Sequence, residues 1–177
     1  MSSQSKLPSP IITEASLSHL PALRRLFVDA VRTHFTYFTP RIQRRVIREH
    51  NLLRLGRAAL HPHRVVLVAH AGNQLVGYAI GSVPAPGSGQ LYWLYVDPAQ
   101  RGQNLGLSLL SRMLRLQQQR GAIEVTLATH DHRRYYERQG FAWVENRLVD
   151  GVNMDIMRFR VGKQVEDDGG LSTAPAV

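Results

Sequence analysis

The segment 97–106 constrains the fold of this chain more than any other part of the sequence. It follows Leu91–Val96, the strongest strand candidate, and leads into residues whose apolar side chains recur at helical spacing. Gly102, Asn104 and Gly106 lie inside it, and glycine and asparagine tolerate positive φ. Such a turn at a helix N-terminus points successive N–H groups at one spot, which suits a pyrophosphate. The sequence therefore predicts a phosphate-binding strand–loop–helix unit, although a tight connection without any ligand fits the same residues.

The rest of the chain predicts helices and strands that alternate around this unit. Helices are expected over a run opened by Pro21, over 41–60 behind Pro40, from 106 to about 120, and from Asp131 to Gln139. Strands are expected at 11–14, 64–69, 75–82, 91–96, 123–128, 141–144 and 154–160, with a loop at 84–89 and a hairpin turn at Asp150-Gly151. This order predicts an α/β domain with a mixed sheet.

The length of 177 residues fits one domain, and we expect it to span residues 10–160. Residues 1–9 are expected to be flexible. The tail 161–177 is expected to be disordered, since it loses apolar periodicity and gains Asp, Gly, Ser and Pro. No apolar run is long enough to span a membrane, and the start lacks a signal-peptide pattern, so a cytoplasmic protein is expected.

The chain contains no cysteine, which excludes disulfides, thiolate metal sites and cysteine nucleophiles. His61 and His63 are close in sequence, but no acidic partner completes a metal site, so we expect no metal.

The chain carries a formal net charge of +9, nearly all of it from arginine. Arginines concentrate where only Glu49 opposes them: Arg41, Arg44, Arg45, Arg48, Arg54 and Arg57. This balance favours an anionic partner, which is a nucleic acid, an acidic substrate or a phosphorylated cofactor, and a solvated helix face explains it equally well. Aromatic residues do not interleave with these arginines, so nucleic acid is the less favoured partner.

Two motifs resemble the GNAT superfamily of N-acetyltransferases. Arg101–Gly106 follows Val96–Pro98 and is similar to the family's acyl-CoA signature, Arg/Gln-x-x-Gly-x-Gly/Ala. Tyr136–Phe141 is similar to the family's Tyr-x-x-x-Gly-Phe element, which lies just past the next strand. The resemblance covers roughly Leu91 to Val144. It departs from the family pattern at Asn104, where glycine is usual, and at Thr129, where the family often has asparagine.

The resemblance implies a mixed, mostly antiparallel twisted sheet flanked by helices. It also implies an enzyme that transfers an acetyl group from acetyl-CoA to a primary amine by direct attack in a ternary complex. The residues that match the family's cofactor contacts are Leu94, Tyr95, Val96, Arg101, Gly102, Gln103, Asn104, Leu105, Gly106, Leu107 and Thr129. Most of these contacts are expected to come from the backbone.

The resemblance also implies catalytic roles for two side chains. Tyr136 matches the general acid that protonates the leaving thiolate, and a phenol with an ordinary pKa near 10 suits that step. Glu124, twelve residues earlier, matches the position of a general base in some family members. His130 and His132 are alternative bases because histidine titrates near neutrality. Each of these side chains also fits a purely structural or surface role.

Two other functions remain open at this level. The same fold serves as a non-catalytic acyl-CoA-binding or interaction module, and the charge admits a nucleic-acid-binding protein. The acceptor amine is unidentified, although the arginine-rich 41–57 stretch favours an acidic acceptor. No membrane partner is expected, and the protein is expected to be a monomer or a homodimer.

Overall fold

The computed structural model describes residues 10–162 of the chain. The predicted flexible start, residues 1–9, and all but the first two residues of the predicted disordered tail lie outside the described residues. The helices are α1 (Leu20–Thr33), α2 (Pro40–Glu49), α3 (Leu52–Leu60), α4 (Leu105–Gln119) and α5 (Arg133–Arg138), with short 3₁₀ turns η1 (Leu17–His19) and η2 (Pro98–Gln100). The strands are β1 (Ile11–Glu14), β2 (Arg64–Ala71), β3 (Gln74–Ala85), β4 (Gly87–Val96), β5 (Ala122–Thr129), β6 (Ala142–Val149) and β7 (Val152–Arg160).

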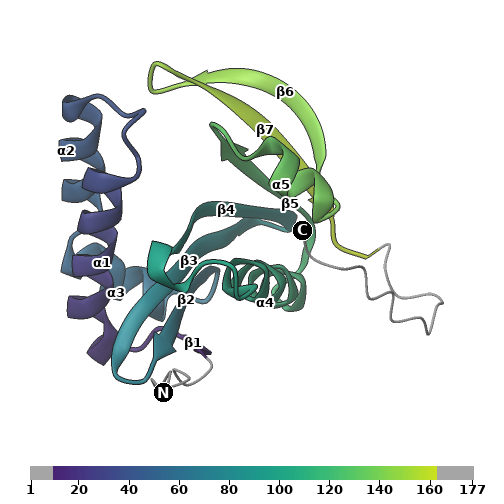
Figure 1. Ribbon diagram of the computed structural model, residues 1–177. Coiled ribbons are helices and arrows are strands. Elements are labelled where there is room, and N and C mark those ends of the chain that lie inside the picture. Colours follow the sequence, from purple (N-terminus) through teal and green to yellow (C-terminus); the bar gives the residue numbers. More distant parts are fainter. Residues whose placement is uncertain (1–9, 163–177) are drawn as a thin grey trace, which may run out of the picture.

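The strands form one seven-stranded sheet in the order β1-β2-β3-β4-β5-β7-β6. Every neighbouring pair is antiparallel except β4 and β5, which run parallel and are connected through α4. The predicted mixed, mostly antiparallel sheet flanked by helices is therefore confirmed. Figure 1 shows α1, α2 and α3 on one side of the sheet and the β6–β7 hairpin arching towards α2.

Two separate cores hold the helices on the sheet. Leu109 and Met113 of α4 are fully buried against Leu67 and other residues on one face. Phe27 of α1 is fully buried against Tyr78 on the opposite face. The apolar residues that recur at helical spacing in α1 and α4 thus form two apolar stripes, one on each helix, that pack against opposite faces of the sheet.

The predicted helix over 41–60 is wrong in one respect, because it is two helices. α2 ends at Glu49, and His50 leaves the helical region with ψ 46°. Asn51 then caps α3, since its side-chain oxygen accepts from the Arg54 amide at 3.0 Å. An asparagine side chain competes for backbone amides in this way, and the cap stabilises a new helix start better than a continued helix.

The predicted loop at 84–89 is also wrong, because β3 and β4 almost meet there and only Pro86 lies between them. Gly87 takes φ 79°, which lets the chain reverse tightly, and it then pairs with Ala122 of β5. The predicted Asp150-Gly151 turn is confirmed, with φ values of 52° and 77°. The strands on either side of that turn are longer than predicted.

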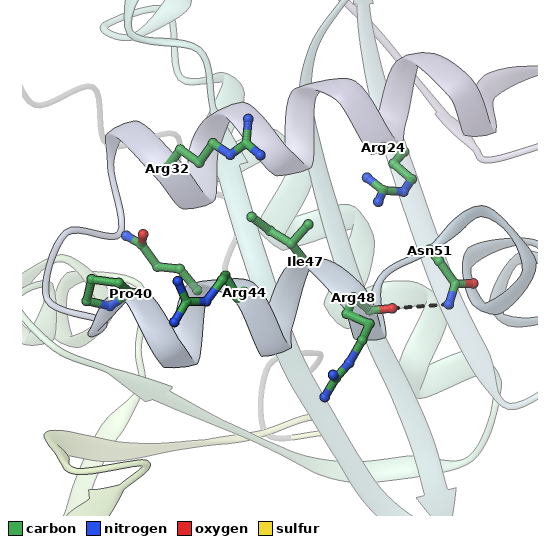
Figure 2. A pocket seen from close by; sticks show the side chains of 8 residues that line it. Arg24, Arg32, Pro40, Arg44, Ile47, Arg48 and Asn51 are labelled. Atoms are coloured by element: carbon green, nitrogen blue, oxygen red, sulfur yellow. Dashed lines mark hydrogen bonds between the residues drawn. The ribbon is translucent and has the colours of Figure 1, made fainter.

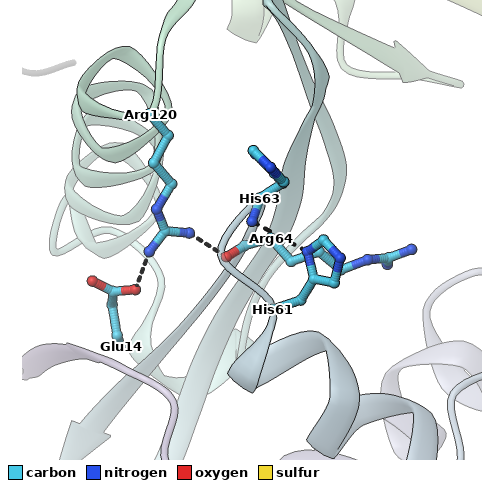
Figure 3. A network of polar contacts seen from close by, with 5 residues as sticks. All are labelled: Glu14, His61, His63, Arg64 and Arg120. Atoms are coloured by element: carbon cyan, nitrogen blue, oxygen red, sulfur yellow. Dashed lines mark hydrogen bonds and ion pairs between the residues drawn. The ribbon is translucent and has the colours of Figure 1, made fainter.

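Arg120, which ends α4, ties this helix to the edge of the sheet. Its Nη2 donates to Glu14 Oε2 of β1 at 2.6 Å, and its Nη1 donates to the Arg64 carbonyl at the start of β2. Figure 3 shows this contact beside the turn in which the His63 amide donates to His61 Nδ1 at 3.2 Å. The first strand is thus fixed to the helix that follows the 97–106 loop.

A β-bulge interrupts the β3–β4 ladder at Tyr92. Ile80 pairs with Trp93 whereas Gly81 pairs with Leu91, so Tyr92 is the extra residue. A bulge bends its strand and increases the local twist. This bend changes the direction of β4 in the middle of the sheet.

Gln117 of α4 secures the backbone beside the bulge. Its side chain is fully buried, and its Nε2 donates to the Gln90 carbonyl at 2.8 Å and to the Ser82 carbonyl at 3.3 Å. Gly81 is required here, since a Cβ at that position would lie 2.5 Å from Gln117 Nε2. The helix and the bulged strands therefore hold each other by hydrogen bonds as well as by apolar contact.

We expect Gln117→Leu to lower the free energy of unfolding by about 1–3 kcal/mol, because two buried carbonyls lose their shared donor. The control is Gln118→Leu, one residue along α4 at an exposed position. Urea unfolding of both variants measures the difference, and equal losses would contradict the assigned role of Gln117.

Candidate active site

β4 and β5 separate at the bulge. Their parallel pairing runs from Gly87↔Ala122 to Leu91↔Leu127 and ends there. Beyond it, residues 92–96 of β4 pair only with β3 among the described strands. We call the divergence of residues 92–96 from residues 128–129 the fork, and Figure 1 shows the two strands diverging towards the side of α1. Backbone groups of β4 on the fork side are free to bind an extended ligand.

The loop beyond the fork is built from local hydrogen bonds. The Asp97 amide donates to the Val76 carbonyl at 2.8 Å, and its side chain accepts from the Ala99 amide at 2.9 Å. Arg101 turns back so that its Nε donates to the Val96 carbonyl at 3.1 Å. These bonds end β4 and set the direction of the following turn.

Gly102 and Asn104 give that turn its shape. Gly102 has φ 80°, and Asn104 lies in the left-handed region with φ 57° and ψ 13°. Asparagine is among the few non-glycine residues that adopt this conformation readily. The replacement of the family's usual glycine by Asn104 is therefore compatible with the turn.

A row of backbone amides faces outward from the loop and the first turn of α4. Within residues 10–162, none of the amides from Gly102 to Leu107 donates a hydrogen bond, and Ser108 is the first to do so, to the Asn104 carbonyl at 2.9 Å. These amides coincide with the positive end of the helix dipole. Amides without partners at the start of a helix are an arrangement that suits a phosphate group.

Tyr135 adds a polar group that sequence analysis did not select. Its hydroxyl is buried without a hydrogen-bond partner among the described residues. It lies beside the start of α4, 3.4 Å from where a Cβ on Gly106 would be. Burial raises its pKa, while Arg138 partly offsets that rise. A buried hydroxyl without a partner is expected to find one in a bound ligand.

Tyr136 lies in the core between α5 and the sheet, with 8% of its surface exposed. Gly140, with φ 85°, ends α5 and returns the chain so that Phe141 packs edge-on against Tyr136 at 5.5 Å between ring centroids. Burial, and to a lesser extent Tyr135 and Tyr37, raise the pKa of Tyr136 well above its usual range. The sequence-based expectation of an ordinary phenol pKa is therefore wrong, and the hydroxyl stays protonated at physiological pH.

The connection between α1 and α2, residues 34–39, brings aromatic side chains to the fork. The Tyr37 ring packs against His130 in a tilted arrangement, with 4.7 Å between ring centroids. Burial, with a smaller contribution from Asp131, raises the pKa of Tyr37 to about 12. Sequence analysis missed Tyr37, although the run of aromatic and histidine residues at 34–38 could have indicated a packed loop.

The same connection faces the β6–β7 hairpin. Phe38 packs with Val152 and Met154 in a small separate core. Arg45 of α2 forms an ion pair with Asp150 in the hairpin turn. These contacts join the end of α1, the start of α2 and the hairpin around one face of β5 and β7.

Glu124 lies on that face of β5. Ala122, Val125 and Leu127 point into the α4 core, and strand alternation places Glu124 on the opposite side. Its side chain is 35% exposed, and its nearest cation is Arg158, with Nε 3.7 Å from Oε2. Because it pairs with Ser88, it lies on the closed side of the fork, where β4 and β5 are still paired. Its carboxylate is thus partly exposed and accessible to water.

Thr129 and His130 lie at the open end of β5. The buried Thr129 hydroxyl accepts from the His132 amide at 3.3 Å and so supports the turn into α5. His132, not Asp131 as predicted, is the N-cap of that helix, and it makes no side-chain cap bond. His130 Nδ1 lies 3.1 Å from the Asn153 carbonyl. A carbonyl only accepts, so Nδ1 donates this hydrogen bond, and Nε2 lies 3.5 Å from Oδ1 of the neighbouring Asp131 carboxylate.

The side chains of the predicted β4 contacts serve the core. Tyr95 is 7% exposed and stacks on Tyr78, while Leu94 and Val96 pack towards α4. Trp93 packs with Phe27 and Phe35. Only backbone groups of this stretch therefore face the fork as ligand contacts.

Comparisons with known proteins agree with this geometry. Residues 62–142 match the model of the acetyltransferase (GNAT) domain. The fold is similar to PaiA N-acetyltransferase from Thermoplasma acidophilum in complex with coenzyme A, with a TM-score of 0.73 and 20% identity over 87% of this chain and 100% of that one. It is also similar to YncA from Salmonella typhimurium with its cofactor acetyl-CoA (TM-score 0.65, 17% identity, 92% and 100% coverage). Ard1 from Thermoplasma volcanium is a third such structure (TM-score 0.66, 21% identity, 87% and 99% coverage). No curated protein matches the chain.

Residues 62–142, which include the fork, the 97–106 loop and Tyr136, therefore match a GNAT acetyltransferase domain. No helix within the described range is long and apolar enough to cross a membrane. Residues 10–162 also contain no group of three or more histidine and acidic side chains placed to hold a metal ion.

Proposed function

We propose that the chain is an N-acetyltransferase that transfers an acetyl group from acetyl-CoA to a primary amine by direct attack in a ternary complex. The observation that carries this proposal is the row of unpaired amides from Gly102 to Leu107 at the end of the fork. The match of residues 62–142 to the acetyltransferase (GNAT) domain and the fold-level likeness to structures that hold coenzyme A or acetyl-CoA support acetyl transfer in general.

The residues present fit acetyl-CoA. The amides of residues 102–107 would hold the pyrophosphate, and the free backbone edge of Leu94–Val96 would pair with the amide groups of the pantetheine arm. The unpartnered Tyr135 hydroxyl offers a further hydrogen bond near Gly106. Arg101 and Thr129 keep spare donor capacity beside their structural bonds, so both remain candidate contacts.

The catalytic groups act around this fork. Bound acetyl-CoA supplies the acetyl group activated as a thioester. A β4 amide within Leu94–Val96 would stabilise negative charge on the carbonyl oxygen. Tyr136 would donate its hydroxyl proton to the departing sulfur, and its raised pKa makes it a persistent donor but a weak acid.

Glu124 is the proposed general base, because it lies on the uncovered face of β5 with its carboxylate accessible to water. It would take the amine proton through a water molecule. His130 is the second candidate, favoured by its place at the open end of β5 and by its contact with Tyr37. The two lie on opposite sides of the point where β4 and β5 separate.

The general test is release of the free CoA thiol when acetyl-CoA is mixed with a panel of amines, peptides and polyamines. Release with at least one amine, together with a thermal shift from acetyl-CoA, is the expected result. The absence of both thiol release and a thermal shift would refute the proposal. A shift without release would favour a non-catalytic acyl-CoA-binding module.

At the loop, Asn104→Val should weaken binding of coenzyme A at least about 10-fold, because a β-branched residue resists positive φ and displaces the amides. Asn104→Gly is the matched control and should bind at least as well as the wild type, since glycine adopts the same backbone freely. Isothermal titration with coenzyme A measures both. Equal affinities for the valine and glycine variants would show that the turn does not depend on this conformation.

Tyr136→Phe should lower kcat about 100-fold with little change in the KM for acetyl-CoA, because it removes the proton donor and keeps the packed ring. Tyr135→Phe is the neighbouring control, and there the expected change is a higher KM for acetyl-CoA with kcat retained. Since the pKa of Tyr136 is raised, the wild-type enzyme should show no loss of kcat from this group up to about pH 10. An unchanged kcat in Tyr136→Phe would remove the acid role.

For the base, we expect Glu124→Gln to lower kcat/KM for the amine about 100-fold, because the substituted amide accepts no proton. His130→Gln and His132→Gln should each cost less than about 10-fold. A thermal shift with acetyl-CoA in every variant confirms that the cofactor site is intact. If His130→Gln proves the most damaging, the base role passes from Glu124 to His130.

A further inference from the structure

A groove runs between α1 and α2 on the outer side of the helical layer, away from the loop at 102–107. It has a volume of about 470 Å³. Its lining residues come from α1, α2 and the cap of α3: Arg24, Arg32, Pro40, Gln43, Arg44, Ile47, Arg48 and Asn51. Figure 2 shows Arg24 and Arg32 on α1 and Arg44 and Arg48 on α2, with Ile47 projecting from α2 towards α1 and Arg48 pointing away from α1.

The groove concentrates unbalanced positive charge. Within residues 10–162, none of its four arginines lies in an ion pair. The stretch 20–60 holds nine arginines and two carboxylates, Asp29 and Glu49, so it accounts for +7 of the chain's net +9. Four arginines that line one groove and have no ion-pair partner among the described residues favour an anionic ligand with several charges.

The walls of the groove are held in place before any ligand binds. Gln43 of α2 donates to the Val31 carbonyl at 3.1 Å and to the Phe35 carbonyl at 3.3 Å, which joins α2 to the end of α1. Asn51 Nδ2 donates to the Arg48 carbonyl at 3.1 Å. The spacing between the two rows of arginines is thus part of the fold.

One end of the groove lies at the connection between α1 and α2. Arg32 and Pro40 line this end, and they flank the connection 34–39. That connection carries Tyr37, which contacts His130 at the fork, and Phe38, which packs against the β6–β7 hairpin. A polypeptide acceptor whose amine lies beside residues 34–39 would extend from there into the groove.

We propose that this groove binds an acidic segment of a polypeptide acceptor close to the amine that is acetylated. This inference rests on the proposed function. Arg24 and Arg32 are eight residues apart on α1, or about 12 Å along the helix. An extended peptide covers that distance in about four residues, so the segment needs about four acidic positions.

The features of the groove favour a peptide over other polyanions. A single-stranded nucleic acid needs aromatic side chains to stack its bases, whereas Phe35 and Trp93 are packed against each other inside the helical layer. A membrane surface needs an exposed apolar face beside the charges. The exposed leucines nearest to the groove, Leu52, Leu53 and Leu60, belong to α3, whereas the groove itself is lined by arginines of α1 and α2. A groove with charges on both helices matches an extended acidic chain.

The test uses the full chain saturated with coenzyme A and a peptide labelled with fluorescein at its carboxyl end. The peptide has a free amino-terminal glycine and alanine, followed by four acidic residues, and its control carries four glutamines instead. The groove variant is Arg44→Glu with Arg48→Glu. Arg54→Glu with Arg57→Glu is the control on α3, outside the groove, and each pair takes the net charge from +9 to +5.

We expect the groove variant to weaken binding of the acidic peptide at least about 10-fold by anisotropy, and the α3 variant less than about 2-fold. The glutamine peptide should bind weakly to all three proteins. Equal weakening by both variants would overturn the inference, since it would indicate general charge attraction. The inference would also be overturned if a DNA oligonucleotide or phosphatidylserine vesicles bound more tightly than the acidic peptide and lost this binding in the groove variant.

Acetylation of a neutral peptide separates this inference from the proposed function. One outcome supports both the enzyme and the groove. In it, the wild type and the groove variant acetylate the neutral peptide at equal rates, and only the wild type favours the acidic peptide. Transfer without any preference for the acidic peptide overturns the groove alone. Selective binding of the acidic peptide, without transfer to any amine, overturns the enzyme and keeps the groove as a peptide site.

Discussion

The rest of the site depends on the point where β4 and β5 stop pairing. Two parallel strands that ran together to their ends would leave no free backbone between them. Here the bulge at Tyr92 turns β4 aside directly after the Leu91↔Leu127 pair, and Gln117 holds the carbonyls next to the bulge. From that point β4 has one paired edge and one free edge, and its free end delivers the chain into the loop before α4. The ligand-binding edge and the amide row are two consequences of one irregularity.

Backbone dipoles and arginine side chains have separate places in this molecule. The proposed phosphate site at Gly102–Leu107 consists of amides and a helix start, and Arg101 beside it is bonded to its own strand. Most of the excess positive charge lies instead on the stretch 20–60. A phosphate held by amides leaves the arginines free for another partner. The net charge is therefore better explained by the acceptor side than by the cofactor.

The differences between expectation and structure share a physical cause. Periodicity alone predicted α2 and α3 as one helix, because the apolar spacing continues through His50. Only the side-chain cap of Asn51 separates the two helices. The proline- and glycine-rich stretch 84–89 was predicted as a loop, yet β5 offers Gly87 a partner, and pairing extends the strands. In both places a contact outside the local pattern decided the outcome. Tyr136 differs for a similar reason, since its raised pKa comes from burial by several elements.

The sequence by itself determined the strand–loop–helix unit, the turn at Asn104 and the pairing of the two motifs, because these depend on neighbouring residues and on backbone preferences. It also determined that positive charge gathers in 41–57. The tertiary structure alone decided that β4 carries a bulge, that Tyr37 reaches the fork and that Arg24, Arg32, Arg44 and Arg48 line one groove. These features arise where helices and strands distant in sequence pack together, and such packing depends on shape and burial that no local pattern records.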